Sequence, residues 1–257
     1  MYETLSSDYD RFVNWQNRLA YEMPFIEKTV KQIQGDSRYP LNILDSACGT
    51  GMHAIALARL GQQVSGADLF PQMVEMSRRN AAKAGVAVRF ESAGFGQLSE
   101  RFGERQFDLL LCLGNSLPHL LSTAELDAAL RDFAACLRRG GMLLIQNRNF
   151  DLVMQHHERW MEPQAHREGN KEWLFQRFYD FEDDGLIRFN IVTLIKENGA
   201  GWQSSVASTR LRPQLHAELT SALRAAGFKR IQAYGSMTGE AFSPASSGNL
   251  VLTAARN

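Results

Sequence analysis

Residues 43–54 read Ile-Leu-Asp-Ser-Ala-Cys-Gly-Thr-Gly-Met-His-Ala. An apolar run ends here in the acidic Asp45 and then breaks into a turn that contains Gly49 and Gly51. This order is typical of a strand that meets the start of a helix at a nucleotide-binding turn. Because glycine lacks a Cβ, the backbone of such a turn can approach a ligand closely. The stretch therefore predicts an α/β fold with a nucleotide-like ligand at this junction.

Charge separates the candidate ligands. The spacing Gly49-x-Gly51-x-x-Ala54 also fits dinucleotide-binding turns. NAD and FAD carry a pyrophosphate, however, and Asp45 at the exit of the strand would repel it. S-adenosylmethionine (SAM) instead carries an ammonium and a sulfonium, which suit carbonyl groups and a nearby carboxylate. We therefore favour a SAM site over an NAD or FAD site, and a purely structural turn is the remaining alternative.

A second acidic residue, Asp68, ends a short predicted strand at 63–67. A carboxylate at the end of the second strand faces the same crevice as the glycine turn, where it can accept both ribose hydroxyls. The alternative is that Asp68 caps the following helix, in which Pro71 stands early. The two roles are compatible.

Composition limits the class of partner. The chain has 257 residues, of which 44% are hydrophobic, and its 28 basic and 28 acidic residues cancel. It suits one large domain or a domain with a lid. Without a basic run we expect no nucleic-acid and no membrane partner. Residues 1–9 lack the charged and apolar parts of a leader peptide, and no window reaches the roughly 18 apolar residues that span a bilayer, so we expect a cytoplasmic protein.

The metal-binding residue types do not form a recognisable site. The three cysteines lie in or beside apolar segments without Cys-x-x-Cys spacing, which predicts buried, reduced thiols. A group of histidines and glutamates at 156–166 has no cysteine nearby and matches no common spacing, so we expect no metal. The cysteines are Cys48, Cys112 and Cys136, and the other residues are His156, His157, Glu158, Glu162 and His166.

Strands and helices alternate over the first part of the chain, which predicts a doubly wound, mostly parallel sheet. Apolar residues at steps of three and four predict an N-terminal helix over 8–34. Arg139-Gly140-Gly141 predicts the end of a helix and the start of a buried strand. The predicted strands are 42–46, 63–67, 87–91, 107–113 and 142–147, and the predicted helices are 52–60, 71–84 and 124–138.

The pattern then changes to an antiparallel insert, with predicted strands at 172–182, 186–196 and about 203–211. A helix at 213–226 and an antiparallel hairpin of strands 229–234 and 249–255 complete a seven-stranded sheet. We divide the chain into an N-terminal helical lid (1–40), a SAM-binding core (41–150), a substrate-side insert (151–212) and the C-terminal part of the core (213–257).

Four stretches resemble the class I, Rossmann-like SAM-dependent methyltransferases, and within them the glycine N-methyltransferase type of small-molecule enzyme. The resemblance covers residues 40–151 well, the C-terminal part in architecture, and the first 40 residues poorly. The first two stretches are common across the superfamily, and the last two are narrower and point to the substrate class. The stretches are Ile43-Leu-Asp-Ser-Ala-Cys-Gly-Thr-Gly51, Val64-Ser-Gly-Ala-Asp68, Leu111-Cys-Leu-Gly-Asn-Ser-Leu-Pro-His119 and Asn147-Arg-Asn-Phe-Asp151.

The resemblance implies a set of cofactor contacts. The family favours Asn then Trp where this chain has Gly94 and Phe95, so adenine recognition here would use backbone groups and the Phe95 ring. The implied contacts are Ala47, Gly49 and Gly51 along the methionyl and ribose segment, Asp68 at the ribose, Leu69 and Met73 on the adenine, Ala93, Gly94 and Phe95 at its edge, and Leu113 and Gly114 behind the methyl group.

Near the N-terminus, Tyr9, Trp15 and Arg18 would fold over the cofactor, with Arg18 meeting its carboxylate. The alternative is a helix that packs Trp15 into the core. Other aromatic and basic residues in the later strands are candidate pocket walls, although aromatic residues in strands are more often part of the core. These are Trp173, Arg177, Tyr179 and Tyr234.

On the acceptor side, the resemblance places Asn115 and His119 as candidate catalytic residues. Alternatively, Asn115 with Ser116 caps the next turn, and His119 is a partly exposed loop residue. Arg148 follows a predicted strand at its carboxyl end, where its guanidinium can hold a substrate carboxylate. Its alternative role is an ion pair with Asp151 or Glu158.

The chain lacks a convincing dedicated base, which favours N-methylation, because an amine needs only to arrive neutral. We therefore predict a methyltransferase for a small amine that bears a carboxylate. The alternatives are an O- or C-methyltransferase of a small metabolite, a non-catalytic SAM-binding module and an NAD-dependent oxidoreductase. The sequence does not predict the oligomeric state.

Overall fold

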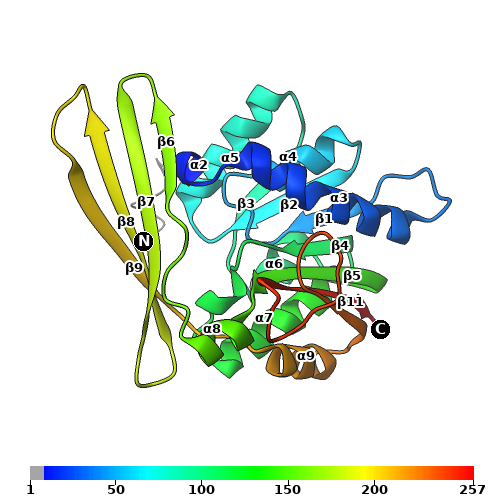
Figure 1. Ribbon diagram of the computed structural model, residues 1–257. Coiled ribbons are helices and arrows are strands. Elements are labelled where there is room, and N and C mark those ends of the chain that lie inside the picture. The colour runs from blue at the N-terminus through cyan, green and yellow to red at the C-terminus, as the bar shows by residue number, and fades with distance from the viewer. Residues whose placement is uncertain (1–8) are drawn as a thin grey trace.

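Two β-sheets organise the part of the chain that the computed structural model describes, residues 9–257 (Figure 1). The larger sheet has seven strands in the order β10-β11-β5-β4-β1-β2-β3, and the smaller has four strands in the order β6-β7-β8-β9. The predicted fold class, a doubly wound α/β sheet with an antiparallel insert and an N-terminal helix, is confirmed. Residues 1–8 of the predicted lid lie outside the described residues.

The larger sheet is parallel from β3 to β5. Strands β1 and β2, β1 and β4, β2 and β3, and β4 and β5 pair in parallel, whereas β11 is antiparallel to both β5 and β10. The predicted C-terminal hairpin is thus confirmed, and the carboxyl ends of β1, β2, β4 and β5 meet at one edge. The strands are β1 (Asn42–Asp45), β2 (Gln63–Asp68), β3 (Arg89–Ser92), β4 (Phe107–Cys112), β5 (Leu137–Arg148), β10 (Phe228–Tyr234) and β11 (Asn249–Arg256).

Helices cover both faces of this sheet, and each face has its own apolar core. Strand β4 is buried along its whole length because it lies between the two layers. One layer contains α3 (Trp15–Gln34), α4 (Met52–Arg59) and α5 (Pro71–Ala84), and the other contains α6 (Leu98–Phe102), α7 (Thr123–Cys136) and α9 (His216–Ala225). All three cysteines are buried and free.

The N-terminal helix is broken. The helical segment predicted over 8–34 is present in the described residues as two helices: the short α2 (Tyr9–Phe12) ends before Asn14, and α3 begins at Trp15. The Asn14 side chain caps α3 by accepting the backbone N–H of Asn17 at 3.1 Å. Asparagine competes with the helical backbone in this way, so it favours a new helix start over a continuous helix.

The junction of α7 and β5 also differs from the prediction. Helix α7 ends at Cys136, and β5 begins at once with the buried Leu137, so Gly140 and Gly141 lie inside a strand and do not end a helix. The pairing of β4 with β5 shifts register at this level, and Gly140 has a φ of 75°. Glycines suit such an irregular strand segment, and in sequence they resemble a helix end.

The insert has one strand more than predicted. The predicted strands appear as β7 (Lys171–Phe181), β8 (Ile187–Glu197) and β9 (Gln203–Leu211), and β6 (Gln164–Glu168) pairs with β7 at the edge. The polar sequence of β6, Gln-Ala-His-Arg-Glu, gave no apolar alternation to indicate a strand. The short helices α6 and α8 (Phe150–His156) were also not predicted.

The smaller sheet stands beside the larger one at its carboxyl edge (Figure 1). The Arg11 guanidinium of α2 pairs with Glu168 of β6 at 3.0 Å. At the other end, the backbone N–H of Arg212 donates to the carbonyl of Pro118 in the short 3₁₀ helix η1 (Leu117–His119). The insert therefore contacts both α2 and the loop that follows β4. Within residues 9–257, no helix is both long and apolar enough to cross a membrane.

Candidate functional site

Two adjoining cavities lie at the carboxyl edge of the larger sheet. The smaller cavity has a volume of about 480 Å³ and lies between the glycine turn after β1 and the ends of β2 and β3. The larger cavity has a volume of about 1160 Å³ and lies between α2, α3, the end of β5 and the smaller sheet. Tyr9, Gly114 and His119 line both cavities. A ligand in one cavity can thus meet a ligand in the other at these three residues.

The two glycines of the turn have different surroundings. Gly49 lines the smaller cavity, and a Cβ at its position would lie 3.5 Å from the Tyr9 ring. Gly51 lines neither cavity, and its Cβ would lie 2.8 Å from both Phe90 and Ser77. With a φ of 82°, Gly51 is the N-cap of α4 and lets this helix pack closely on the sheet.

Asp68 lies at the carboxyl end of β2 and lines the smaller cavity. One of its oxygens accepts the backbone N–H of Gly49 at 2.9 Å, and the other accepts that of Phe70 at 3.0 Å. Burial raises the pKa of Asp68, and the two N–H groups oppose this rise. Helix α5 has no side-chain cap, so the capping alternative is wrong. Because a carboxylate offers about four acceptor positions, two remain for a ligand.

The far end of the smaller cavity is apolar. Leu69 is 61% exposed there, and the Phe95 ring is held edge-on against Phe133 with ring centroids 5.5 Å apart. Gln97, which the sequence did not single out, also lines this end and accepts the backbone N–H of Gly94 at 3.0 Å. The Gln97 side chain thus supplies an amide at this end of the cavity, where Gly94 has no side chain. It escaped notice because it precedes α6, a helix that was not predicted.

Beneath the glycine turn lies a group of buried charges. Asp45 is only 2% exposed, its Oδ2 has no hydrogen-bond partner, and burial raises its pKa to about 6. Glu22 of α3 accepts from Arg18 at 3.1 Å and contacts the His53 ring nitrogen at 2.6 Å. Burial alone would raise the pKa of Glu22, but His53 and Arg18 hold it below its usual value. Glu22 lies outside the quoted motifs, and His53 stands in the first of them without a predicted role, so the sequence did not indicate this pair.

The N-terminal helices are fixed to the glycine turn. Asp10 accepts the Thr50 hydroxyl at 2.6 Å and the Trp15 indole N–H at 2.7 Å. The Arg18 guanidinium lies over the Trp15 ring, 5.0 Å from its centroid, and a Cβ on Gly114 would lie 3.0 Å from it. Trp15 is half-buried and lines the larger cavity with Arg18, so it is not a core residue.

The loop after β4 separates the two cavities. Asn115 has a φ of 64°, and its Oδ1 accepts the backbone N–H of Arg148 at 3.0 Å. Ser116, not Asn115, precedes η1, and it makes no side-chain cap there, so the capping alternative for Asn115 is wrong. His119 is half-buried between the cavities, and burial lowers its pKa to about 4. Its imidazole is therefore neutral at pH 7.

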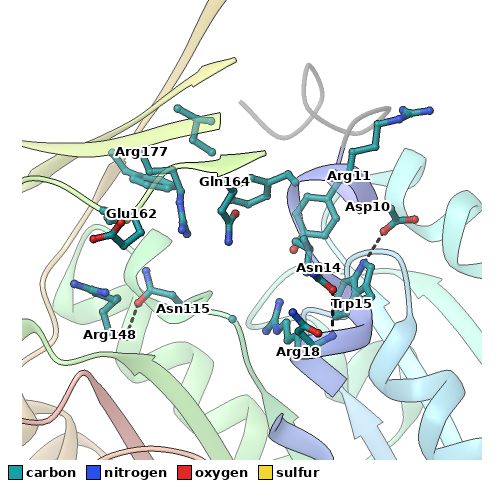
Figure 2. A pocket seen from close by; sticks show the side chains of 18 of the residues that line it. Asp10, Arg11, Asn14, Trp15, Arg18, Asn115, Arg148, Glu162, Gln164 and Arg177 are labelled. Atoms are coloured by element: carbon teal, nitrogen blue, oxygen red, sulfur yellow. Dashed lines mark hydrogen bonds between the residues drawn. The ribbon is translucent and has the colours of Figure 1, made fainter. Parts of the chain in front are cut away.

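Two arginines face each other across the larger cavity (Figure 2). Arg148 rises from the end of β5 and pairs with Glu158 at 3.3 Å, whereas Asp151 accepts the backbone N–H of His216 instead. Arg177 points down from β7, and within the described chain it forms no ion pair. Both burial and the charge of Arg148 lower the pKa of Arg177.

The predicted site residues divide between the cavities. Trp173 is buried with Phe175, and Tyr234 packs on Phe25, so these two are not pocket walls, whereas Arg177 and Tyr179 are. Within residues 9–257, no three His, Cys, Asp or Glu side chains are placed to hold a metal. Of the predicted residues, the smaller cavity is lined by Tyr9, Ala47, Gly49, Asp68, Leu69, Met73, Ala93, Gly94 and Phe95. The larger cavity is lined by Trp15, Arg18, Asn115, His119 and Arg148. Three predicted residues line neither cavity: Asp45, Gly51 and Leu113.

Comparison with known proteins gives consistent results. The methyltransferase domain family matches residues 43–141. A glycine/sarcosine N-methyltransferase of Aphanothece halophytica is 30% identical over 197 residues, which cover 74% of this chain and 72% of that enzyme. Among solved structures, a SAM-dependent methyltransferase from Clostridium acetobutylicum has a TM-score of 0.78 at 15% identity and covers 100% of this chain and 99% of that one. A sugar N-methyltransferase from Streptoalloteichus has a TM-score of 0.77 at 20% identity, with 97% and 92% covered.

Proposed function

Because this chain belongs to the class I SAM-dependent methyltransferases related to the glycine/sarcosine N-methyltransferases, we propose that it methylates the nitrogen of a small amine that carries a carboxylate. As a member of this family, the chain is a SAM-dependent methyltransferase that acts on a small molecule. The carboxylate on the acceptor is inferred from Arg148, which ends β5, lines the larger cavity and is held through its backbone N–H by Asn115.

The residues of the smaller cavity fit SAM. Asp68 keeps two acceptor positions for the ribose hydroxyls. Asp45 lies outside the cavity, buried beneath the glycine turn, and from there its unpartnered Oδ2 adds negative charge that favours the methionyl ammonium. Leu69 and Phe95 offer apolar surface for the adenine, and Gln97 offers an amide. When bound there, SAM supplies an electrophilic methyl group.

In this proposal the larger cavity holds the acceptor. The Arg148 guanidinium binds the acceptor carboxylate, and Asn115 fixes the Arg148 backbone through its 3.0 Å hydrogen bond. The neutral His119 ring, at the boundary of the cavities, accepts an N–H of the amine and so turns the nitrogen lone pair towards the methyl group. Alignment of this kind and exclusion of water contribute on the order of 7–11 kcal/mol to such reactions.

Proton transfer follows from the pKa of His119. As the new nitrogen–carbon bond forms, the sulfur–carbon bond breaks and the nitrogen gains the positive charge. With a pKa of about 4, His119 is too weak a base to remove a proton from an ammonium group. The acceptor must therefore arrive as the neutral amine, and the proton leaves to water after transfer.

An amino sugar is the second candidate acceptor. The relative of known structure from Streptoalloteichus acts on a sugar nitrogen. The larger cavity, at about 1160 Å³, is far larger than glycine requires. An amine on a sugar thus fits the same site, and an acceptor screen separates it from an amino acid.

The test is a kinetic comparison of Arg148→Lys with the wild type. We expect the KM for the acceptor to rise tenfold or more while cofactor affinity stays within about twofold, because an ammonium cannot reproduce the planar fork of the guanidinium. Glycine, sarcosine and larger amino acids are screened first, with amines that lack a carboxylate and amino sugars beside them. Arg79→Lys, on the exposed face of α5, is the matched control.

Two results would contradict the proposal. If the preferred acceptor has no acidic group, the carboxylate is not what Arg148 recognises. If Arg148→Lys turns over with an unchanged KM, Arg148 serves only as the ion-pair partner of Glu158.

A further inference from the structure

Arg177 is a half-buried charge that is flanked by apolar side chains on its own sheet. It lies in the middle of β7, on the face of the smaller sheet that lines the larger cavity. Its neighbours on that face are Phe175 and Tyr179 along the strand and Ile191 opposite on β8, and all three are buried. A charged side chain in such surroundings is costly unless a group of opposite charge meets it.

No acid of the described chain supplies that group. Within residues 9–257 Arg177 forms no ion pair, its Nε is buried without a hydrogen-bond partner, and its guanidinium lies over the Phe12 ring, 5.2 Å from the centroid. Three acids line the cavity, and within the described residues none of them forms an ion pair with Arg177. Asp10 bonds to Thr50 and Trp15, Glu22 bonds to Arg18 and His53, and Glu162 is exposed and pairs with no arginine.

The other arginines of the cavity differ from Arg177 in this respect. Arg11 pairs with Glu168 at 3.0 Å, and Arg18 with Glu22 at 3.1 Å. Arg148 has only a 3.3 Å contact with the half-exposed Glu158, and its own Nε is buried without a partner. The Arg148 charge acts directly on Arg177, so two guanidinium groups share one region of the cavity.

The strand fixes the direction of Arg177. Its backbone is paired with Ile191 of β8, and its carbonyl accepts hydrogen bonds from Met161 and Gln176. From this framework the guanidinium points towards Asn115 and Arg148 on the opposite wall (Figure 2). The Tyr179 ring, whose pKa burial raises to about 12, lies under the influence of both arginine charges and stays neutral at pH 7.

We propose that Arg177 binds a second anionic group of the acceptor, so that the preferred acceptor is an amine with two negative charges held between Arg148 and Arg177. This inference rests on the proposed function. The second charge can belong to a carboxylate or to a phosphate or phosphonate, because a guanidinium binds each of them through paired hydrogen bonds. The larger cavity has room for such a molecule, whereas glycine would leave most of the cavity empty.

The experiment compares acceptors that differ in one acidic group. Aspartate is assayed against asparagine, glutamate against glutamine, and phosphoserine against serine, with the wild-type enzyme and saturating SAM. We expect the dianionic member of at least one pair to have a KM at least tenfold lower. The carboxylate pairs and the phosphate pair show which acidic group the site prefers.

Variants assign that preference to Arg177. In Arg177→Met the KM for the acceptor with two acidic groups rises at least tenfold, the KM for the partner that has only the α-carboxylate stays within about threefold, and Arg177→Lys restores part of the difference. Arg167→Met, an exposed arginine of the neighbouring strand β6, is the matched control and changes neither value. Unchanged binding of S-adenosylhomocysteine shows that the variants are folded.

A second readout does not need turnover. Succinate and malonate, which carry two carboxylates and no amine, should raise the melting temperature of the wild type more than acetate does, and Arg177→Met should lose this difference. Equal KM values within every acceptor pair, together with equal stabilisation by acetate and succinate, would overturn the inference and leave the proposed function intact. Stabilisation by succinate that depends on Arg177, without methylation of any amine, would keep the anion site and refute the proposed function.

Discussion

Replacement of Asp68 by asparagine probes the ribose contact. The two Asp68 oxygens accept the backbone N–H groups of Gly49 and Phe70 at 2.9 and 3.0 Å, which leaves one free acceptor position on each oxygen. In Asp68→Asn one oxygen becomes an NH₂ group, which accepts nothing. The variant loses one backbone bond and one ribose bond, and the charge that strengthens the remaining bonds.

The expected loss of affinity follows from these bonds. A hydrogen bond to a charged group contributes about 1.5–3 kcal/mol, so the loss of one ribose bond weakens binding by about 10- to 150-fold. Calorimetry of S-adenosylhomocysteine measures this directly. We expect wild-type binding in the micromolar range, about −8 kcal/mol. Asp68→Asn should bind about 1.5–3 kcal/mol more weakly.

The control is Asp36→Asn, an exposed acid in the loop before β1, which should bind like the wild type. An unchanged dissociation constant in a folded Asp68→Asn variant would refute the assigned role of Asp68. No detectable binding to the wild type would refute the cofactor site as a whole.

Three further predictions concern the same region. Burial raises the pKa of Asp45 to about 6, so the affinity for S-adenosylhomocysteine, measured by calorimetry, should fall as the pH drops below about 6 and Asp45 loses its charge. Asp45→Asn should remove this pH dependence, and a flat profile in the wild type would contradict the prediction. Gly51→Ala should lower the free energy of unfolding in urea by about 2–4 kcal/mol, because Gly51 has a φ of 82° and a Cβ there would lie 2.8 Å from Phe90 and Ser77. Gly61 has the same φ but open space around it, so an equal loss of stability in Gly61→Ala would show that close packing at Gly51 is not the cause. Amide exchange over residues 9–20 should slow when S-adenosylhomocysteine binds, since Tyr9 and Asp10 lie on the glycine turn, and unchanged exchange would leave these helices without a lid role.

Local pattern was enough to predict the central part of the fold. The alternation of apolar strands with periodic helices is a property of short stretches, and the predicted sheet is confirmed. The order of Asp45, Gly49 and Asp68 is also a local pattern, and two of these residues, Gly49 and Asp68, line the smaller cavity. The alternating strands of the insert were recognisable for the same reason. The polar edge strand β6 was missed because its residues carry no apolar alternation.

The remaining features depend on contacts between distant parts of the chain. In sequence, Gly51 resembles a ligand-binding glycine, but the nearness of Phe90 and Ser77 shows that packing requires it. Likewise, the sequence offered Arg177 as a candidate pocket wall, but it gave no sign that this arginine lacks an acid partner. The inferred anion-binding role of Arg177 depends on two features of the folded chain: no acid of the described residues pairs with Arg177, and Arg148 lies across the cavity from it.

Transfer of a ¹³C-labelled methyl group tests the central claim most directly. The enzyme is incubated with SAM labelled at its methyl carbon and with the acceptor panel, and the products are followed by NMR. We predict a new methyl signal at the chemical shift of an N-methyl group, correlated with the α-proton of a carboxylate-bearing amine, and formed in proportion to S-adenosylhomocysteine. A methyl signal on oxygen or carbon, or S-adenosylmethionine that binds but keeps its label in the presence of every amine, would contradict the account.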